Sequence, residues 1–391
     1  MTLTQLPSDF YGMESQLTER EQEAIAGLRA AMEPMRAVVD EHWHRDEFPM
    51  DVIPAIAATG VLGHSWEETQ TFPASAVYRG WAALEMARVD ASLSTFVGVQ
   101  NGLAAGSIGA CGSPEQRTEW LPRLASGEVI GAFGLTEPLS GSDSARGLRT
   151  TARRDGDAWV LDGAKRWIGN ATFADVVIIW AKDVADDQVK GFIVPTTTPG
   201  FSATKIERKI ALRMVQNADI VLEGVRVPES LRLQRADSFR DTARVLRLTR
   251  AEVAWAAVGV MAGAYEAAVR YTGEREQFGQ PIAGHQLVQD LLAKSLGAIT
   301  ASIALCAQVS RMQDEGTQED AHSALAKAFT TARMREVVGW CREVCGGNGI
   351  VTDHDVARFF ADAEALYSYE GTFQMNQLIV GRAITGRAAF A

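Results

Sequence analysis

A single carboxylate, Glu370, stands in an apolar and aromatic stretch near the carboxyl end of the chain, which reads LYSYEGTFQM from Leu366 to Met375. An ionised carboxylate is costly to bury unless it has a partner or a task. Two interpretations are therefore open: Glu370 is a surface residue, or it is a base kept in a pocket. In an apolar cleft its pKa would rise toward the working pH, which makes a carboxylate a better general base.

Two further segments have residue types that bind ligands and precede or follow expected strands. FGLTEPLSGSDS, residues 133–144, enters a loop of small and hydroxyl residues, whose N–H and O–H groups can bind carbonyl or phosphate oxygens. Such loops are also ordinary turns between strands. AKRWIGN, residues 164–170, contains Trp167, an indole that either fills the core or supports a planar ring.

Two more segments lie at the ends of expected long helices. In EREQFGQP, residues 274–281, Arg275 and Phe278 suit a phosphate and a ring, although an exposed arginine at a helix end fits equally. In CGGNGI, residues 345–350, the glycines expose backbone donors, and helix termination alone would also explain them.

The elements that must position these residues follow from periodicity and capping. Thr18 with Glu21 forms a capping-box signature before an apolar 3–4 repeat. Residues 129–226 instead contain short β-branched runs, and the Asp-Gly pairs 155–156 and 162–163 predict hairpins. Long helical patterns return after Pro228, which indicates a bundle. Helices are expected at 18–39, 51–59, 75–89, 91–109, 115–125, 241–272, 281–314 and 318–345.

This order predicts an α+β multi-domain fold. We expect an N-terminal α-helical domain over residues 1–130, a middle antiparallel β domain (sandwich or barrel) over 131–235, and a C-terminal α-helical bundle domain over 236–391. A chain of 391 residues is longer than one hydrophobic core usually serves, which agrees with several packed units.

Composition excludes several classes of protein. A net charge of −11 argues against nucleic-acid binding, which needs a dense basic face. The apolar stretch 253–265 is shorter than the roughly 20 residues of a membrane span, so no membrane contact is expected. No targeting signal is visible, which predicts a cytoplasmic protein. The four cysteines are too scattered for a disulfide framework, and no metal site is expected.

Taken together, these segments resemble the acyl-CoA dehydrogenase family. GAFGLTEPLSGSD, AKRWI, REQFG, CGGNG and YEGTFQ stand at that family's positions and spacing over nearly the whole chain. RVD at 88–90, WLPRLASGE at 120–128 and GRAITG at 381–386 are most similar to the glutaryl-CoA dehydrogenase subfamily. The resemblance implies a helix–sheet–helix fold, bound FAD, a homotetramer or dimer, and electron transfer to an electron-transferring flavoprotein.

The resemblance also implies roles for the motif residues. Glu370 would take the α-proton of an acyl thioester while flavin N5 takes the β-hydride, and Gly371 would leave the thioester carbonyl room to reach a backbone N–H. Arg250 matches a residue held close to the glutamate, and Thr249 stands where some members have a rival base. FAD contacts are implied for Phe133, Leu135, Thr136, Ser142, Trp167, Ile168, Gly169, Arg275, Phe278, Gln286, Gly346, Gly347, Thr372 and Gln374.

Three departures from the family pattern limit what the resemblance implies. Ser94 stands where glutaryl-CoA dehydrogenases hold a carboxylate with an arginine, so we expect no decarboxylation. Gly169 replaces a threonine whose hydroxyl meets flavin N5. The arginines 240, 244, 247 and 250 share one helix face, either as an ion-paired surface or as a strip for CoA phosphates or an acidic carrier protein. Substrate contacts are expected from Ser94, Ser142, Arg247, Tyr369 and Gly371, with Leu93, Phe96 and Trp255 shaping the pocket.

The sequence thus predicts an FAD-dependent α,β-dehydrogenase of a small or branched acyl-CoA, without decarboxylation. Three alternatives stay open. One is a dehydrogenase of acyl groups on a carrier protein, and another is a flavin oxidase or monooxygenase on the same fold. The last is a non-catalytic scaffold.

Overall fold

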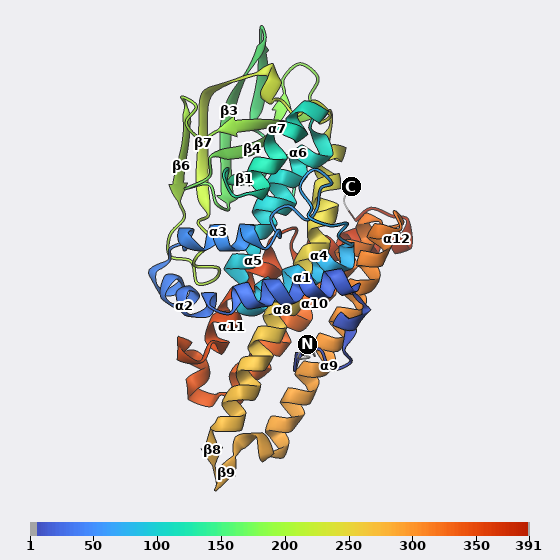
Figure 1. Ribbon diagram of the computed structural model, residues 1–391. Helices are drawn as coiled ribbons and strands as arrows, with labels where there is room; N and C mark the ends of the chain where they lie inside the picture. The colour runs from blue at the N-terminus through green and yellow to red at the C-terminus, as the bar shows by residue number, and fades with distance from the viewer. Residues whose placement is uncertain (1–5, 390–391) are drawn as a thin grey trace.

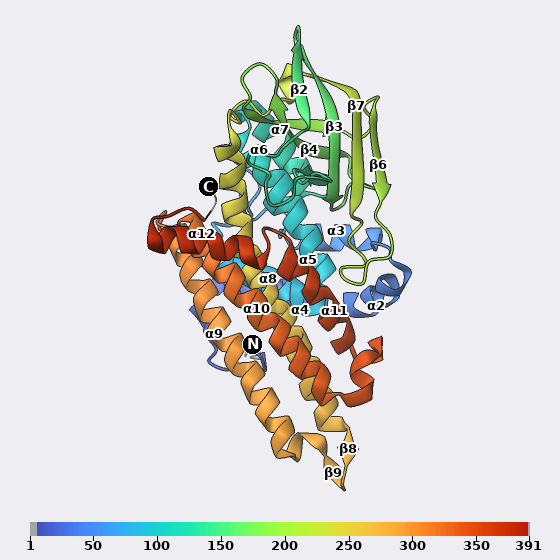
Figure 2. The same cartoon turned by 180° about the vertical axis from the view of Figure 1, so that it is seen from behind.

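Long helices cross at the middle of the molecule, with a sheet at one end and a helical bundle at the other (Figure 1). The computed structural model describes residues 6–389. Seen from behind, α9, α10 and α11 run side by side below the sheet (Figure 2). The predicted order of helices, then strands, then helices is confirmed.

The amino-terminal part is helical, as predicted, but the single helix expected at 18–39 is divided at Pro34 into two helices. The capping box between Thr18 and Glu21 is present at the start of α1, with the Thr18 side chain accepting from the Glu21 N–H. Ser75 caps the helix that begins at Ala76, and Asp90 caps the helix that begins at Ala91, each by accepting a bond from a backbone N–H. The α-helices of this part are α1 (Glu19–Met32), α2 (Met35–Arg45), α3 (Ile53–Ala58), α4 (Ala76–Val89), α5 (Ala91–Val97), α6 (Gly106–Cys111) and α7 (Pro114–Ala125).

One predicted helix differs in its winding. The continuous helix expected at 91–109 is divided, because residues Gly98–Ala105 (η3) form a π-helix between α5 and α6. A π-turn widens the helix and rotates the residues that follow it, and such turns are frequent at functional sites. Here Val99, Asn101 and Leu103 of η3 line a cavity.

The middle part is a seven-stranded sheet with the order β1-β4-β2-β3-β7-β6, and β5 pairs with the other side of β4. Most pairs are antiparallel, as expected, whereas β1–β4 and β2–β4 are parallel. Parallel pairing joins strands distant in the chain, which local turn signals do not reveal. The strands are β1 (Gly131–Gly134), β2 (Thr151–Asp155), β3 (Ala158–Ile168), β4 (Val176–Asp183), β5 (Val189–Pro195), β6 (Phe201–Lys205) and β7 (Ala218–Pro228).

One of the two predicted hairpins is wrong. Asp155-Gly156 forms the β2–β3 turn, with Asp155 paired to Ala158. Asp162 and Gly163 instead lie inside β3, where the register with β7 shifts between Leu161 and Gly163. The Asp162 carboxylate accepts from the N–H of Gly224 on β7, so this aspartate stabilises a bulge and not a turn.

The carboxyl-terminal part is dominated by α8, which packs against α4, α9, α10 and α11. At Gly259 the α4 backbone comes so close that a Cβ atom would lie 2.3 Å from the Leu84 carbonyl oxygen. α9 begins at Gln286 and not at Pro281, because Pro281 belongs to a short hairpin. The elements are α8 (Phe239–Glu274), β8 (Glu276–Gln277), β9 (Gln280–Pro281), α9 (Gln286–Asp314), α10 (Asp320–Val344), α11 (Val356–Ser368) and α12 (Phe373–Thr385).

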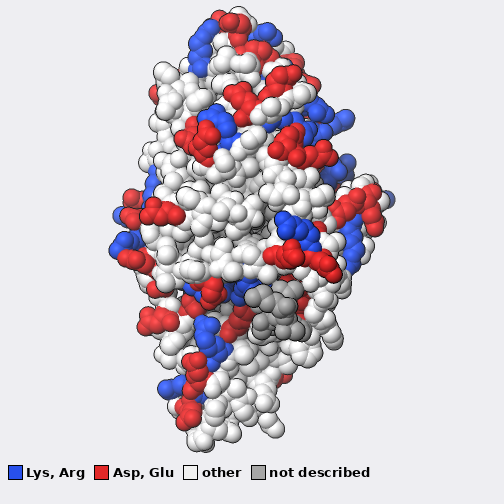
Figure 3. Space-filling view, in the orientation of Figure 1, with Lys and Arg blue, Asp and Glu red and all other residues white. Residues whose placement is uncertain are grey.

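By length and composition alone, α9 is apolar enough to cross a membrane, and 39% of its most apolar window is buried inside the protein. Core helices of soluble proteins meet the same criterion. α9 packs on α8, α10 and α4. On the face drawn in Figure 3, the region over its lower part has few charged side chains.

Candidate active site

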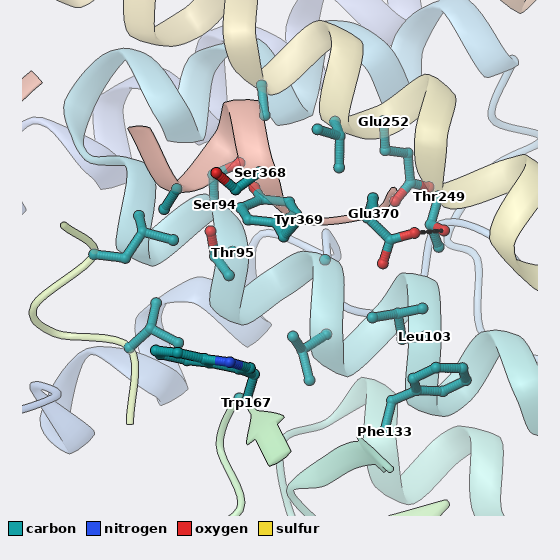
Figure 4. A pocket seen from close by; sticks show the side chains of 18 of the residues that line it. Ser94, Thr95, Leu103, Phe133, Trp167, Thr249, Glu252, Ser368, Tyr369 and Glu370 are labelled. Atoms are coloured by element: carbon teal, nitrogen blue, oxygen red, sulfur yellow. Dashed lines mark hydrogen bonds between the residues drawn. The ribbon is translucent and has the colours of Figure 1, made fainter. Parts of the chain in front are cut away.

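A cavity of about 840 Å³ lies where the ends of β1 and β3 meet α4, η3, α8 and the turn between α11 and α12. Figure 4 shows Glu370 and Thr249 on one side of it and Trp167 and Phe133 on another. Residues from three of the five segments singled out in the sequence line this cavity. The predicted site residues in its wall are Ser94, Phe133, Leu135, Thr136, Ser142, Trp167, Ile168, Gly169, Arg250, Tyr369, Glu370, Gly371 and Thr372.

Glu370 lies in a tight turn that the surrounding side chains hold in place. Its φ is +53°, in the left-handed region that non-glycine residues seldom adopt, and Gly371 follows with φ +83°. The Lys327 ammonium donates to the carbonyl oxygens of Gly371, at 2.8 Å, and Tyr367, at 3.1 Å. The Asn376 amide also donates to the Gly371 carbonyl, at 2.8 Å. These bonds fix a strained backbone that directs the Glu370 side chain into the cavity.

Opposing effects act on the pKa of the Glu370 carboxyl group. Burial raises its pKa above the ordinary value. The nearby Arg250 and Lys327 charges, and a hydrogen bond of 3.0 Å donated by the Thr249 hydroxyl, act in the other direction. Burial also lowers the pKa of Lys327, to about 7. A carboxyl with a raised pKa but several groups that favour its ionised form suits a base that gains a proton during a reaction.

The opposite wall is built by the ends of β1 and β3 and the loop after β1. A buried ion pair of 2.9 Å joins Glu137 to Lys165, and Glu137 also accepts from the N–H groups of Arg149 and Thr150. The Arg166 N–H donates to the Thr136 carbonyl oxygen at 2.8 Å. The loop that contains Thr136 and Ser142 is therefore tied to β3, beside Trp167.

This wall fits the isoalloxazine ring that the sequence predicts. The Trp167 side chain is 51% exposed although it lines the cavity, and its backbone has φ +65°. Its carbonyl oxygen accepts from the Asn217 amide at 3.2 Å. At Gly169 a Cβ atom would have ordinary contacts of 3.4 and 3.5 Å with Val99 and Val215, so space does not exclude a side chain there. An open aromatic surface beside exposed backbone polar groups suits a planar ring system.

Seven predicted site residues lie outside the cavity wall. Gln374 is exposed in the first turn of α12, and Arg247 forms an ion pair of 2.6 Å with Asp320. The other five are exposed at the ends of long helices or in the β8–β9 hairpin, at the opposite end of the molecule from the sheet (Figure 1). They are Arg275, Phe278, Gln286, Gly346 and Gly347.

The arginine face of α8 is partly satisfied within the chain. The Arg244 guanidinium donates to the Ala110 carbonyl oxygen at 2.6 Å, and Arg247 pairs with Asp320. Arg250 points inward and lines the cavity. These contacts favour the interpretation of an ion-paired surface over a free basic strip.

Three residues expected to shape the pocket do not line it. Leu93 and Phe96 are fully buried and do not line the cavity, and Phe96 packs on Phe48 with ring centroids 4.7 Å apart. Trp255 lines a smaller neighbouring cavity and donates to the Ser310 hydroxyl. Tyr369 does line the main cavity, beside Ser94 and Thr95 (Figure 4).

Several polar residues of the site were missed in the sequence. Lys327 is a lone cation within a run of small residues on α10, and a lysine in such a run signals burial with a partner. Glu252 stands one helical turn after Thr249, immediately before the apolar stretch of α8. His64, Arg79 and Asn101 have no such signal, because their position depends on how α4 and η3 pack.

Comparisons with known proteins agree with this arrangement. The acyl-CoA dehydrogenase N-terminal, middle and C-terminal domain families match residues 18–128, 132–225 and 239–385. An acyl-CoA dehydrogenase of Bacillus subtilis is 32% identical over 87% of this chain and 91% of its own length. The mouse mitochondrial short-chain specific acyl-CoA dehydrogenase is 32% identical over 76% of this chain and 73% of its own.

A solved structure supports the same conclusion. The glutaryl-CoA dehydrogenase of Mycobacterium smegmatis, determined in complex with FADH2, has a TM-score of 0.94 and 35% identity, covering 99% of this chain and 100% of that one. The chain belongs to the acyl-CoA dehydrogenase family, which comprises FAD-binding oxidoreductases that act on CH–CH groups.

Proposed function

We propose that the protein oxidises a small or branched acyl thioester between Cα and Cβ, with Glu370 as the general base and without decarboxylation. One observation carries the proposal: the Glu370 side chain enters the cavity from a strained turn, opposite the wall that fits a flavin. A thioester that lies between the two has its α-carbon facing a carboxylate.

The chain's own residues account for the proton transfer. Thr249, Arg250 and Lys327 favour the ionised carboxylate before the reaction, and burial makes it a stronger base than a solvated glutamate. The glycine at 371 leaves the turn open beside the Glu370 N–H, a donor for the oxygen of the developing enolate. Loss of the α-proton to Glu370 and of the β-hydride gives the α,β-enoyl thioester. FAD, when bound, supplies the hydride acceptor.

The flavin would be held by the wall opposite Glu370. Phe133, Leu135 and Thr136 come from the end of β1, and Ser142 from the loop behind it. Trp167, Ile168 and Gly169 come from the end of β3, and Thr372 lies just after the base. We assign Gln374 to the same end of the cofactor.

The acyl end of the cavity argues against a decarboxylated substrate. Position 94 is a serine, whose hydroxyl donates to the Ala83 carbonyl oxygen at 3.3 Å, so the side chain at this position supplies no cation. A buried carboxylate needs a cation close to it. A dicarboxylic acyl group therefore lacks, at position 94, the cation that would bind its distal carboxylate.

We also infer a homotetramer and an electron-transferring flavoprotein as the electron acceptor. Arg275, Phe278, Gln286, Gly346 and Gly347 are exposed and remote from the cavity of their own chain, as expected for residues that contact FAD in a neighbouring subunit. The partly exposed apolar face of α9 supports a contact between subunits.

A panel of acyl-CoA thioesters, mixed anaerobically with the FAD-loaded protein, tests the proposal. Bleaching of the flavin by short or branched acyl-CoA, with an enoyl-CoA product and no CO2, is the expected result. Absence of bleaching by every saturated thioester would contradict it. The same acyl groups on a carrier protein, and reoxidation of the reduced protein by air, decide between this function and the two enzymatic alternatives.

A further inference from the structure

Four polar side chains that the proposed flavin contacts do not include also line the cavity. His64, Arg79, Asn101 and Glu252 all line it, and we call this group the polar recess. Arg79, Asn101 and Glu252 also line a second cavity of about 190 Å³. These three therefore lie at the boundary between the two cavities.

Two of the four are deeply buried with polar atoms left unpaired. His64 is 7% exposed and Asn101 is 2% exposed. Within residues 6–389, His64 Nδ1 and Asn101 Oδ1 have no hydrogen-bond partner, although the Asn101 amide donates to the Ser65 hydroxyl at 2.9 Å. Burial and the Arg79 charge lower the pKa of His64 to about 3, so its ring is neutral. Unpaired buried polar atoms are uncommon and call for a ligand or an explanation.

The other two have opposite charges but do not pair. Arg79 donates to the Ala74 carbonyl oxygen at 2.8 Å, and no carboxylate of the described chain is within ion-pair distance. The Glu252 carboxyl likewise has no hydrogen-bond partner in the part of the chain that the structure describes. A Cβ atom at Gly102 would lie 2.8 Å from Glu252 Oε2, so the glycine of η3 makes the space that this carboxyl occupies.

The recess is close to the reacting end of the cavity. Thr249, which binds the Glu370 carboxylate, lies three residues before Glu252, about 4.5 Å along α8. On α4, Arg79, Ala83 and Met86 form one face, and the Ala83 carbonyl oxygen accepts from Ser94. A substituent on the acyl chain, a few bonds from Cα, can therefore reach the recess.

We propose that the polar recess binds a hydroxyl group on the acyl chain, so that the substrate is a hydroxylated acyl thioester. This inference rests on the proposed function. A hydroxyl both donates and accepts, and the recess offers a donor in Arg79 and acceptors in Asn101 Oδ1 and Glu252. A carboxylate would meet Arg79 but face Glu252 and Glu370, and an ammonium would face Arg79.

Four five-carbon thioesters test the proposal: valeryl-CoA, 5-hydroxyvaleryl-CoA, glutaryl-CoA and 5-aminovaleryl-CoA. The FAD-loaded protein is expected to have a kcat/KM at least about tenfold higher for 5-hydroxyvaleryl-CoA than for valeryl-CoA, as one hydrogen bond to a charged group provides. Arg79→Met and Glu252→Gln should each remove most of that preference. Arg45→Met, on exposed α2, should change neither rate.

The outcomes separate this inference from the proposed function. Oxidation of valeryl-CoA with no preference for the hydroxyl group, or an unchanged preference in both variants, would overturn the recess assignment alone. A preference for glutaryl-CoA or 5-aminovaleryl-CoA would overturn it in favour of a charged ligand. If none of the four bleaches the flavin while another saturated thioester of the wider panel does, the recess assignment is overturned and the proposed function stands. Flavin content and Tm establish that each variant is folded.

Discussion

The Thr249 hydroxyl donates a hydrogen bond of 3.0 Å to the Glu370 carboxylate, across a cavity wall that joins residues 121 positions apart in the chain. In the family pattern, position 249 is where some members have a rival base. Here the same position instead supports the ionised form of the proposed base. The two residues therefore act as one unit.

Replacing Thr249 by valine should raise the pKa of Glu370, because the ionised carboxylate loses a donor. A hydrogen bond to a charged group is worth about 1.5–3 kcal/mol, or about 1–2 pH units. The acidic limb of the kcat/KM profile should move to higher pH by that amount. Thr249→Ser should restore the wild-type profile, and an unmoved limb in the valine variant would exclude the proposed role.

Lys327 should make the free energy of unfolding rise with pH on the alkaline side of pH 7. Burial lowers its pKa from 10.5 to about 7, so between these values the unfolded chain binds a proton that the folded chain does not. Stability therefore rises with pH in this window, by up to about 1.4 kcal/mol per unit from this group. Lys327→Met should lack that rise. Denaturant unfolding from pH 7 to 10 measures the difference, and parallel curves would show that Lys327 does not titrate there.

Glu252 should act in the opposite sense. Burial, and the neighbouring Glu370, raise its pKa from 4.5 to about 7, so the folded chain keeps a proton that the unfolded chain releases between these values. Wild-type stability therefore falls as pH rises through this window and stays lower above it. The Tm of the Glu252→Gln variant should therefore rise relative to that of the wild type between pH 4.5 and 7.5, so that the variant is the more stable protein at pH 7.5. A difference that does not change with pH would contradict the assignment.

Ser94→Arg should improve the binding of dicarboxylic acyl thioesters relative to monocarboxylic ones. Ser94 lines the cavity and an arginine there would provide a cation for the distal carboxylate. A gain of about tenfold in relative affinity is expected from one charge-assisted hydrogen bond. Titration of glutaryl-CoA and valeryl-CoA into both proteins measures it, with Ser94→Gln as the uncharged control. Equal ratios in all three would remove Ser94 from the acyl pocket.

The fold was largely predictable because its signals are local. The Thr18–Glu21 capping box, the Asp155-Gly156 turn and the apolar repeats of α8 to α10 each depend on a few neighbouring residues. The bulge at Gly163 and the parallel pairing of β4 depend on contacts between distant segments, and the π-winding of η3 has no local sequence signal, so none of the three is predicted by the sequence.

The residues of the candidate site were likewise predictable only where the signal is local. Glu370, Trp167 and Thr136 were identified because their motifs are contiguous, and the structure places them around one cavity. Lys327 and Glu252 were missed, since each is defined by a helix face that only packing turns toward Glu370. The positions of Arg275 and Phe278 depend on a neighbouring chain in our proposal, and a single sequence contains no direct signal for that.

The most direct test of the central claim compares Glu370→Gln with the wild-type protein in anaerobic flavin reduction by a thioester that the wild type oxidises. The amide cannot accept the α-proton, so reduction should slow by about 10²–10⁴-fold while FAD content is unchanged. Glu128→Gln, the same change at an exposed glutamate that does not line the cavity, should retain wild-type reduction of the thioester. Reduction of the Glu370→Gln flavin at a rate near that of the wild type would contradict the account.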